Sequence, residues 1–296
     1  MSWQVLIILQ TVIIAFSTIS IRALTRQKSL SNSVLALNGI QSVVYYVGIL
    51  CLLPFIGSIQ FGKIHEFLPF LVAAGLLLAG SNACGFKVLS HLDAGFGTIL
   101  GTLGAVFTII FAAIVLGEEL NLTQAIGSVI LLLGVCYGLL IARQHHKGKK
   151  NHRAWLWGLI FAVFSGLFIA LALVDEKYLL GHMNGPTLMF YAVGFQMLGS
   201  LLLGAMFEPK GYRLIKNKSV MRLNILGGSF RSVSAVLFII ALVKSNNVAL
   251  VGVIEQFKLV VIIILAALIL KERDRLGQKL MAACVAILGL VIIFWK

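Results

Sequence analysis

The chain has 296 residues, of which 60% are hydrophobic and 11% are charged, and its formal net charge is +14. Soluble domains carry about a quarter charged residues and are less than half apolar, so this composition excludes an ordinary soluble enzyme. The basic residues lie mostly between apolar runs, where such residues set membrane topology, so the charge does not indicate nucleic-acid binding.

Apolar runs follow one another along the whole chain. At about 20 apolar residues per crossing, they predict an all-α, multi-pass integral protein of the cell (plasma or inner) membrane, with the lipid bilayer as its surroundings. In chain order, the expected transmembrane helices cover residues 3–21, 34–56, 67–90, 94–116, 123–142, 155–175, 186–207, 222–244, 248–270 and 276–295. The first run lacks a basic leading region and a cleavage pattern, so we expect a retained helix rather than a signal peptide.

A basic segment, residues 143–154, divides the ten expected helices into five and five. Shifting the chain by 154 residues aligns the two halves. The residues from Val106 to Gln124 then align with those from Val260 to Gln278, and nine of them are identical. Because a five-helix unit is odd, its second copy must enter the membrane in the opposite direction. We therefore predict two inverted five-helix repeats, residues 1–142 and 155–296, an architecture typical of secondary transporters.

Each half also ends on a recognisable segment. These segments read LGEELNLTQAIGSVILLLGV (Leu116–Val135) and LKERDRLGQKLMAACVAILGL (Leu270–Leu290). They resemble the closing signatures of the two halves in the drug/metabolite transporter (DMT) superfamily, most closely in its EamA-type, ten-helix members. The resemblance implies transport of small metabolites, often amino acids or related compounds, driven by an ion gradient or by exchange.

The ninth helix departs from that family in one place. Ile254-Glu255-Gln256 resembles a Leu-Glu-Pro sequence that is often found there, with Gln256 in place of proline. The change removes an expected kink.

Three ionisable residues lie well inside the expected membrane layer: Arg231, Glu255 and Lys258. Each costs about 2.5–3.5 kcal/mol near a helix centre, so we expect them to face a wet cavity or one another. Glu255 and Lys258 share a helix face and form a natural pair, which leaves Arg231 without a partner nearby in the sequence. This arrangement predicts a cationic site for a carboxylate or phosphate oxygen. The alternative is a buried ion-pair network that touches no substrate.

Glu255 is the only acidic residue that the predicted helix boundaries place in the membrane interior. We therefore expect Glu255 to act as a counter-ion or as the carrier of a coupling proton.

Uncharged polar residues offer the other walls of a binding site. Asn38, Gln41 and Tyr45, together with Ser42, recur at helical spacing and form one polar stripe on the second helix, which favours a cavity wall. Further candidates of the same kind are Gln10, Asn82, Tyr191 and Gln196.

Two other patterns favour structural roles. The GxxxG spacings of Gly97 with Gly101, and of Gly134 with Gly138, predict close helix packing. Glu118 and Glu272, which follow the fourth and ninth helices, are expected to be loop or capping features.

No nucleophile–base set, cofactor loop or metal-ligand spacing appears, so we expect neither an enzyme nor a cofactor or metal site. We expect a secondary transporter of a small polar, anionic or zwitterionic metabolite, coupled to a proton or to an exchanged solute. The alternatives are a carrier of cationic or drug-like compounds that uses Glu255, a lipid flippase, and a non-transporting subunit that matches its charges with another chain.

The basic residues also bear on orientation. When loops are assigned alternately to two sides, and Arg231 and Lys258 are omitted, 18 lysines and arginines lie on the side of the central linker and four on the other. The positive-inside rule therefore places the linker in the cytoplasm and both termini outside. The family resemblance implies the reverse. We follow the charges, because they belong to this chain.

Overall fold

The computed structural model describes residues 2–60, 64–116, 122–146, 152–245, 255 and 257–294. Its α-helices are α1 (Trp3–Thr25), α2 (Val34–Leu52), α3 (Ile64–His91), α4 (Ala94–Gly101), α5 (Leu103–Leu116), α6 (Leu122–His146), α7 (His152–Leu180), α8 (Gly185–Phe207), α9 (Lys218–Ser245), α11 (Lys258–Ile269) and α12 (Leu276–Phe294). Short 3₁₀ segments add η1 (Lys28–Ser33), η2 (Leu53–Phe55) and η3 (Pro209–Lys216). The described residues contain no strand, so the all-α prediction is confirmed.

Within the described ranges, nine stretches are long and apolar enough to cross a membrane, with α4 and α5 forming one of them. The shorter apolar helix Lys258–Ile269 lies in the second part of the expected helix 248–270. Residues 246–254 and Gln256, which make up most of its first part, lie outside the described residues. The chain is thus a multi-pass integral membrane protein, as predicted.

Two expected helices differ from the structure. The run 94–116 is not one helix, because α4 ends at Gly101 and α5 begins at Leu103. Four glycines between residues 95 and 104 lower the helix propensity there. The sixth helix continues past residue 175 to Leu180, so Asp175 and Glu176 lie within it. The expectation that Glu255 is the only acidic residue in a membrane helix is therefore wrong.

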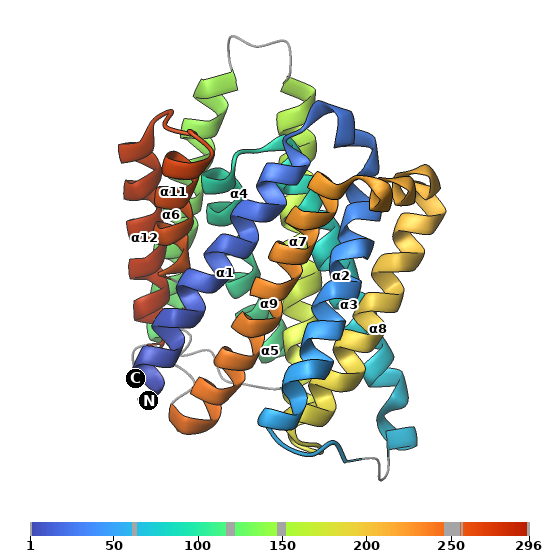
Figure 1. Ribbon diagram of the computed structural model, residues 1–296. Helices are drawn as coiled ribbons and strands as arrows, with labels where there is room; N and C mark the ends of the chain where they lie inside the picture. Colours follow the sequence, from blue (N-terminus) through green and yellow to red (C-terminus); the bar gives the residue numbers. More distant parts are fainter. Residues whose placement is uncertain are drawn as a thin grey trace.

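The two halves run in opposite directions through the molecule. Helix α1 begins, and α12 ends, at one end of the bundle, which we call the termini side; α6 ends and α7 begins at the opposite end, the linker side (Figure 1). Helix α1 climbs towards the linker side and its repeat counterpart α7 descends from it (Figure 1). Each packs on a helix of the other half, α1 on α9 and α7 on α3, as inverted repeats require.

Helices α6 and α12 approach closely through small residues. A Cβ atom on Gly134 would lie 2.7 Å from the backbone nitrogen of Ala286, and one on Gly127 would lie 2.6 Å from the carbonyl oxygen of Gly289. The packing role predicted for Gly134 is confirmed. The same role is wrong for Gly101, where an added Cβ would have no neighbour within 4 Å.

Ion pairs join several helices at the linker side. Arg22 Nε of α1 lies 2.8 Å from Glu272 Oε1, and Glu272 Oε2 accepts a hydrogen bond from Ala94 N at the start of α4. Lys279 of α12, only 2% exposed, pairs with Asp93 at 2.8 Å. The capping role expected for Glu272 is confirmed, whereas Glu118 lies outside the described residues.

Candidate substrate site

A cavity of about 810 Å³ lies between the two halves. Its walls come from α1, α3, α4, α5, α6, α7, α9, α11 and α12, so both repeats contribute. It reaches from Leu89 and Gly97, below the linker-side ion pairs, towards Lys177 and Ile293 near the termini side. Its charged lining residues among those described are Lys177, Arg231, Glu255 and Lys258, and its hydroxyl groups belong to Thr18, Ser81, Thr98, Thr102, Thr108 and Ser165.

Arg231 is held in the cavity wall by two neutral side chains. Its Nη2 donates a hydrogen bond to Asn82 Oδ1 at 2.7 Å, and its Cζ lies 4.6 Å from the centroid of the Tyr45 ring. No carboxylate of the described residues forms an ion pair with it. The guanidinium is therefore positioned by amide and aromatic contacts and not by an ion pair with a described residue.

Tyr45 is a buried residue that supports Arg231 from behind the cavity. It is 7% exposed and does not line the cavity itself. The Ser232 hydroxyl donates a hydrogen bond to the Tyr45 carbonyl oxygen at 3.0 Å, which ties α9 to α2 one residue from Arg231. The aromatic face is thus fixed relative to the guanidinium.

Glu255 and Lys258 form the pair that their spacing predicts. Lys258 Nζ lies 2.5 Å from Glu255 Oε1, and both residues line the cavity. The carboxylate therefore neutralises Lys258 and not Arg231.

The Glu255–Lys258 pair aligns with the place in the first half where α4 ends and α5 begins. The 154-residue shift that aligns Val106 with Val260 places Gly101 on Glu255 and Gly104 on Lys258. Gly101 ends α4, and Lys258 begins α11 directly after a turn at Phe257. Discontinuous helices of this kind line the binding sites of inverted-repeat transporters. In this chain the break between α4 and α5 carries glycines, and the aligned positions of the second repeat carry the ion pair, so both charges of the pair come from the second repeat.

The other predicted wall residues lie outside this cavity. Gln10 is 3% exposed and donates a hydrogen bond to Ser234 Oγ at 3.0 Å. Tyr191 makes an edge-on contact with the Phe190 ring, with 5.0 Å between the ring centroids. Asn38, Gln41 and Gln196 are fully buried between helices. Of the uncharged candidates, only Asn82 lines the cavity.

Sequence reasoning missed several lining residues. Lys177 lies beyond the predicted end of its helix at residue 175, although α7 continues past it to Leu180. Ser81 and Ser165 face each other across α3 and α7, with 3.3 Å between their hydroxyl oxygens. A lone serine in an apolar helix gives no signal of its own, because its hydroxyl can bond to the preceding turn.

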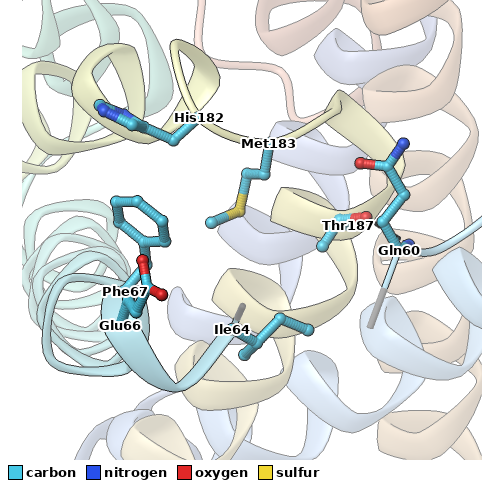
Figure 2. A pocket seen from close by; sticks show the side chains of 7 residues that line it. All are labelled: Gln60, Ile64, Glu66, Phe67, His182, Met183 and Thr187. Carbon is cyan, nitrogen blue, oxygen red and sulfur yellow. Dashed lines mark hydrogen bonds between the residues drawn. The ribbon is translucent and has the colours of Figure 1, made fainter. Parts of the chain in front are cut away.

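A second cavity, of about 510 Å³, lies at the termini side between α3 and the turn that joins α7 to α8. Figure 2 shows the Phe67 and His182 rings beside it, and their centroids are 4.8 Å apart. The walls also include the Met183 side chain and the Glu66 carboxylate. None of the predicted site residues lies here.

The fold and the polar cavity between its halves define a membrane protein of the inverted-repeat class. The chain matches the EamA-like transporter family over residues 1–140 and again over residues 156–295. It therefore belongs to that family, a group of membrane transporters of small solutes, and the resemblance noted in the sequence is confirmed.

Comparison with other proteins supports the fold alone. No curated protein matches the chain. Among 24 matching chains of solved structures, one crystal structure, described only as that of a protein, is 16% identical. The match covers 96% of this chain and 94% of the other, with a TM-score of 0.57. At this identity the likeness shows the architecture and not the substrate.

Proposed function

We propose that the protein is a secondary carrier that moves a small polar metabolite bearing an anionic group, such as an amino-acid-like compound or another anionic or zwitterionic solute, by alternating access. The observation that carries this proposal is the setting of Arg231. It lines the cavity between the repeats, and it contacts a neutral amide and an aromatic ring. Glu255 is already paired with Lys258. An anionic group on the solute would supply the negative charge that pairs with Arg231.

The geometry favours a carboxylate or phosphate oxygen as that group. A guanidinium presents several N–H donors in one plane, and the contact with Asn82 uses one of them. Two parallel hydrogen bonds to a carboxylate are the strongest arrangement that such a fork can make. Asn82 and the hydroxyls of Ser81 and Ser165 line the same cavity and can bind the polar remainder of the solute.

Glu255 is the proposed coupling group. A solute anion that approaches Lys258 competes with Glu255 for the ammonium group. Proton binding at Glu255 would then accompany solute binding. A proton-coupled carrier would work in this way. A carrier that exchanges two solutes would use the same binding site without proton binding at Glu255.

The alternatives receive less support. A carrier of cationic compounds would need Glu255 as the attracting charge, but Lys258 already occupies that carboxylate. A non-transporting subunit would match Arg231 and Lys258 with charges from another chain, yet Lys258 is already paired with Glu255 within this one. A flippase would bind a lipid headgroup, which the experiment below includes.

The experiment begins with the purified protein in detergent, screened by thermal shift against amino acids, sugar phosphates, amines, nucleosides and short-chain phospholipids. We expect an anionic or zwitterionic compound to stabilise it. In proteoliposomes, Arg231→Ala should then slow transport of that compound by about tenfold or more, since hydrogen bonds to charged groups contribute about 1.5–3 kcal/mol. Arg231→Lys should retain part of the rate as a point charge.

The control is Gly277→Ala, since a Cβ there meets no atom within 4 Å. Wild-type transport by a stably folded Arg231→Ala protein would overturn the proposed role of Arg231. Stabilisation by amines alone would favour the cation carrier, and stabilisation by phospholipids alone would favour the flippase.

A further inference from the structure

A set of buried polar side chains lies between α2, α8 and α9, outside the cavity. The set, which we call the polar seam, consists of Asn38, Gln41 and Ser42 on α2, Gln196 and Ser200 on α8, and Asn224 on α9. Each residue is at most 2% exposed. Each also has at least one side-chain oxygen or nitrogen without a hydrogen-bond partner in the described part of the chain.

Such a set is costly in a permanent helix interface. A buried polar group without a partner costs about 1–3 kcal/mol, and most buried polar atoms in proteins are paired. Helix pairs meant to stay together use small or apolar residues, as α6 and α12 do through Gly127 and Gly134. The polar seam is therefore better suited to a state in which these side chains meet water or solute.

The polar seam begins at the level of the candidate site. Tyr45, which stacks on Arg231, shares the α2 face of Asn38, Gln41 and Ser42. Asn38 lies seven residues nearer the linker side, a rise of about 10 Å along the helix. On α9 the nearest atom to a Cβ built on Gly227 would be Gln41 Nε2, so this face of α2 lies directly against α9.

An ion pair and several hydrogen bonds close the linker-side end of the polar seam. Lys87 Nζ lies 2.7 Å from Glu208 Oε1, and Glu208 Oε2 accepts hydrogen bonds from the backbone nitrogens of Leu35 and Ala36 at the start of α2. The Tyr212 hydroxyl of η3 donates a hydrogen bond to the Leu201 carbonyl oxygen at 2.8 Å. Burial and the nearby Glu208 carboxylate raise the pKa of Tyr212, which keeps this hydroxyl protonated as a donor.

We infer that the polar seam is the linker-side half of the solute pathway, closed in this structure and opened when α2 separates from α8 and α9. The inference rests on the proposed carrier function. In the open state the amides and hydroxyls of the polar seam become hydrated and offer hydrogen bonds to a polar solute that leaves Arg231. Lys87 and Glu208 then act as the closing contact at its mouth.

The test introduces single cysteines into a protein whose native Cys51, Cys84, Cys136 and Cys284 are replaced by alanine and which still transports. Ser42→Cys and Ser200→Cys each report on the polar seam, so one remains if the other does not fold. Ala282→Cys is the matched control, because Ala282 is equally buried but faces α6. A membrane-impermeant methanethiosulfonate reagent is added to the linker side of sealed vesicles, and a cysteine at Gly148 identifies that side.

We expect both seam cysteines to react from the linker side, and Lys87→Met to accelerate their reaction by about tenfold, the effect of weakening the closure by about 1.4 kcal/mol. The control cysteine should not react in either background. Seam cysteines that react no faster than the control in both backgrounds would overturn the inference and leave the role of Arg231 untouched. If the seam cysteines react as expected but Arg231→Ala transports like the wild type, the proposed binding site is wrong and the inferred pathway is retained.

A second measurement separates a pathway from packing. Gln41→Leu removes polar atoms that have no partner, so it should raise the midpoint of thermal unfolding while it slows transport. Gln10→Leu, which loses the hydrogen bond to Ser234, should lower the midpoint. A lower midpoint with unchanged transport for Gln41→Leu would assign the polar seam to packing.

Discussion

Two charged residues of the cavity wall, Arg231 and Lys258, have partners at very different distances along the sequence. The pairing of Glu255 with Lys258 follows from helical spacing and could be predicted. The contact of Arg231 with Asn82 joins residues 149 positions apart, and no local pattern points to it. Sequence reasoning therefore finds which residues carry charge in the membrane, but only the packing of α9 on its neighbours shows what surrounds them.

Glu255 is the residue on which proton coupling is predicted to depend. Glu255→Gln keeps the shape of the side chain but cannot release or bind a proton in the same range. We expect net transport to lose its dependence on the pH gradient while exchange of solute continues. Counterflow and gradient-driven uptake in proteoliposomes measure the two activities separately.

Asp175→Asn is the comparison for that experiment, since Asp175 Oδ2 of α7 is buried and has no hydrogen-bond partner within the described residues. Should Asp175→Asn abolish the pH dependence and Glu255→Gln leave it intact, the coupling carboxylate lies on α7.

Lys279 is predicted to matter for stability. Lys279→Met leaves the Asp93 carboxylate without its cation in a largely buried setting, where breaking an ion pair costs up to about 3–5 kcal/mol. The midpoint of thermal unfolding in detergent should fall. The double variant Asp93→Asn with Lys279→Met should recover much of the loss, and Lys216→Met on exposed η3 should change little. An unchanged midpoint for the single variant would show that the pair contributes nothing.

At the scale of helices, apolar runs predicted the positions of the elements well and their interruptions poorly. Hydropathy does not change at Gly101 and Thr102, yet α4 ends there, because backbone preference and not polarity decides whether a helix continues. The end of α7 was placed too early for a related reason: Asp175, Glu176 and Lys177 interrupt the apolar run, but the backbone remains helical to Leu180. The missed residue Lys177 follows directly from that error.

The contact between α6 and α12 gives a prediction of its own. In Gly134→Ala the new methyl group would lie 2.7 Å from the Ala286 backbone nitrogen, and a backbone cannot move aside as a side chain can. We expect a lower midpoint of thermal unfolding, although alanine favours helices more than glycine does. Gly277→Ala has room for its methyl group and should be neutral or slightly stabilising. Equal midpoints for the two variants would show that α6 and α12 can separate without cost.

For the whole molecule, the duplication was readable in the sequence because nine identities recur at one fixed shift. That shift, together with an odd helix count, was enough to predict the inverted architecture to which the family assignment also leads. The repeat in the sequence could not reveal the cavity, because its walls are formed by helices of both halves and only tertiary packing determines which helices meet there.

The orientation of the molecule in the membrane is predicted from its basic residues. The alternating assignment of the predicted loops gives 18 of them to the linker side and four to the termini side, so the linker should lie in the cytoplasm. Single cysteines introduced at Ser2 and at Gly148, labelled in intact cells with a membrane-impermeant reagent, decide the question. We expect reaction at Ser2 and not at Gly148, and the reverse pattern would establish cytoplasmic termini.

The ion pairs of Arg22 with Glu272 and of Lys279 with Asp93 join helices at the linker side, and the 154-residue shift does not place the same residue pairs at the other end. The 154-residue shift places Glu176 at the position of Arg22 and Asn247 at that of Asp93. For the proposed carrier, two chemically different closures mean that the two access states of the empty protein are not equally populated, even without a gradient. If these ion pairs are the stronger closure, we expect the empty carrier to favour access from the termini side, and half-saturation from that side to need less solute than from the linker side. Such an asymmetry would appear as different half-saturation concentrations and maximal rates from the two sides, set by side chains outside the binding site, and not as net flow without a gradient.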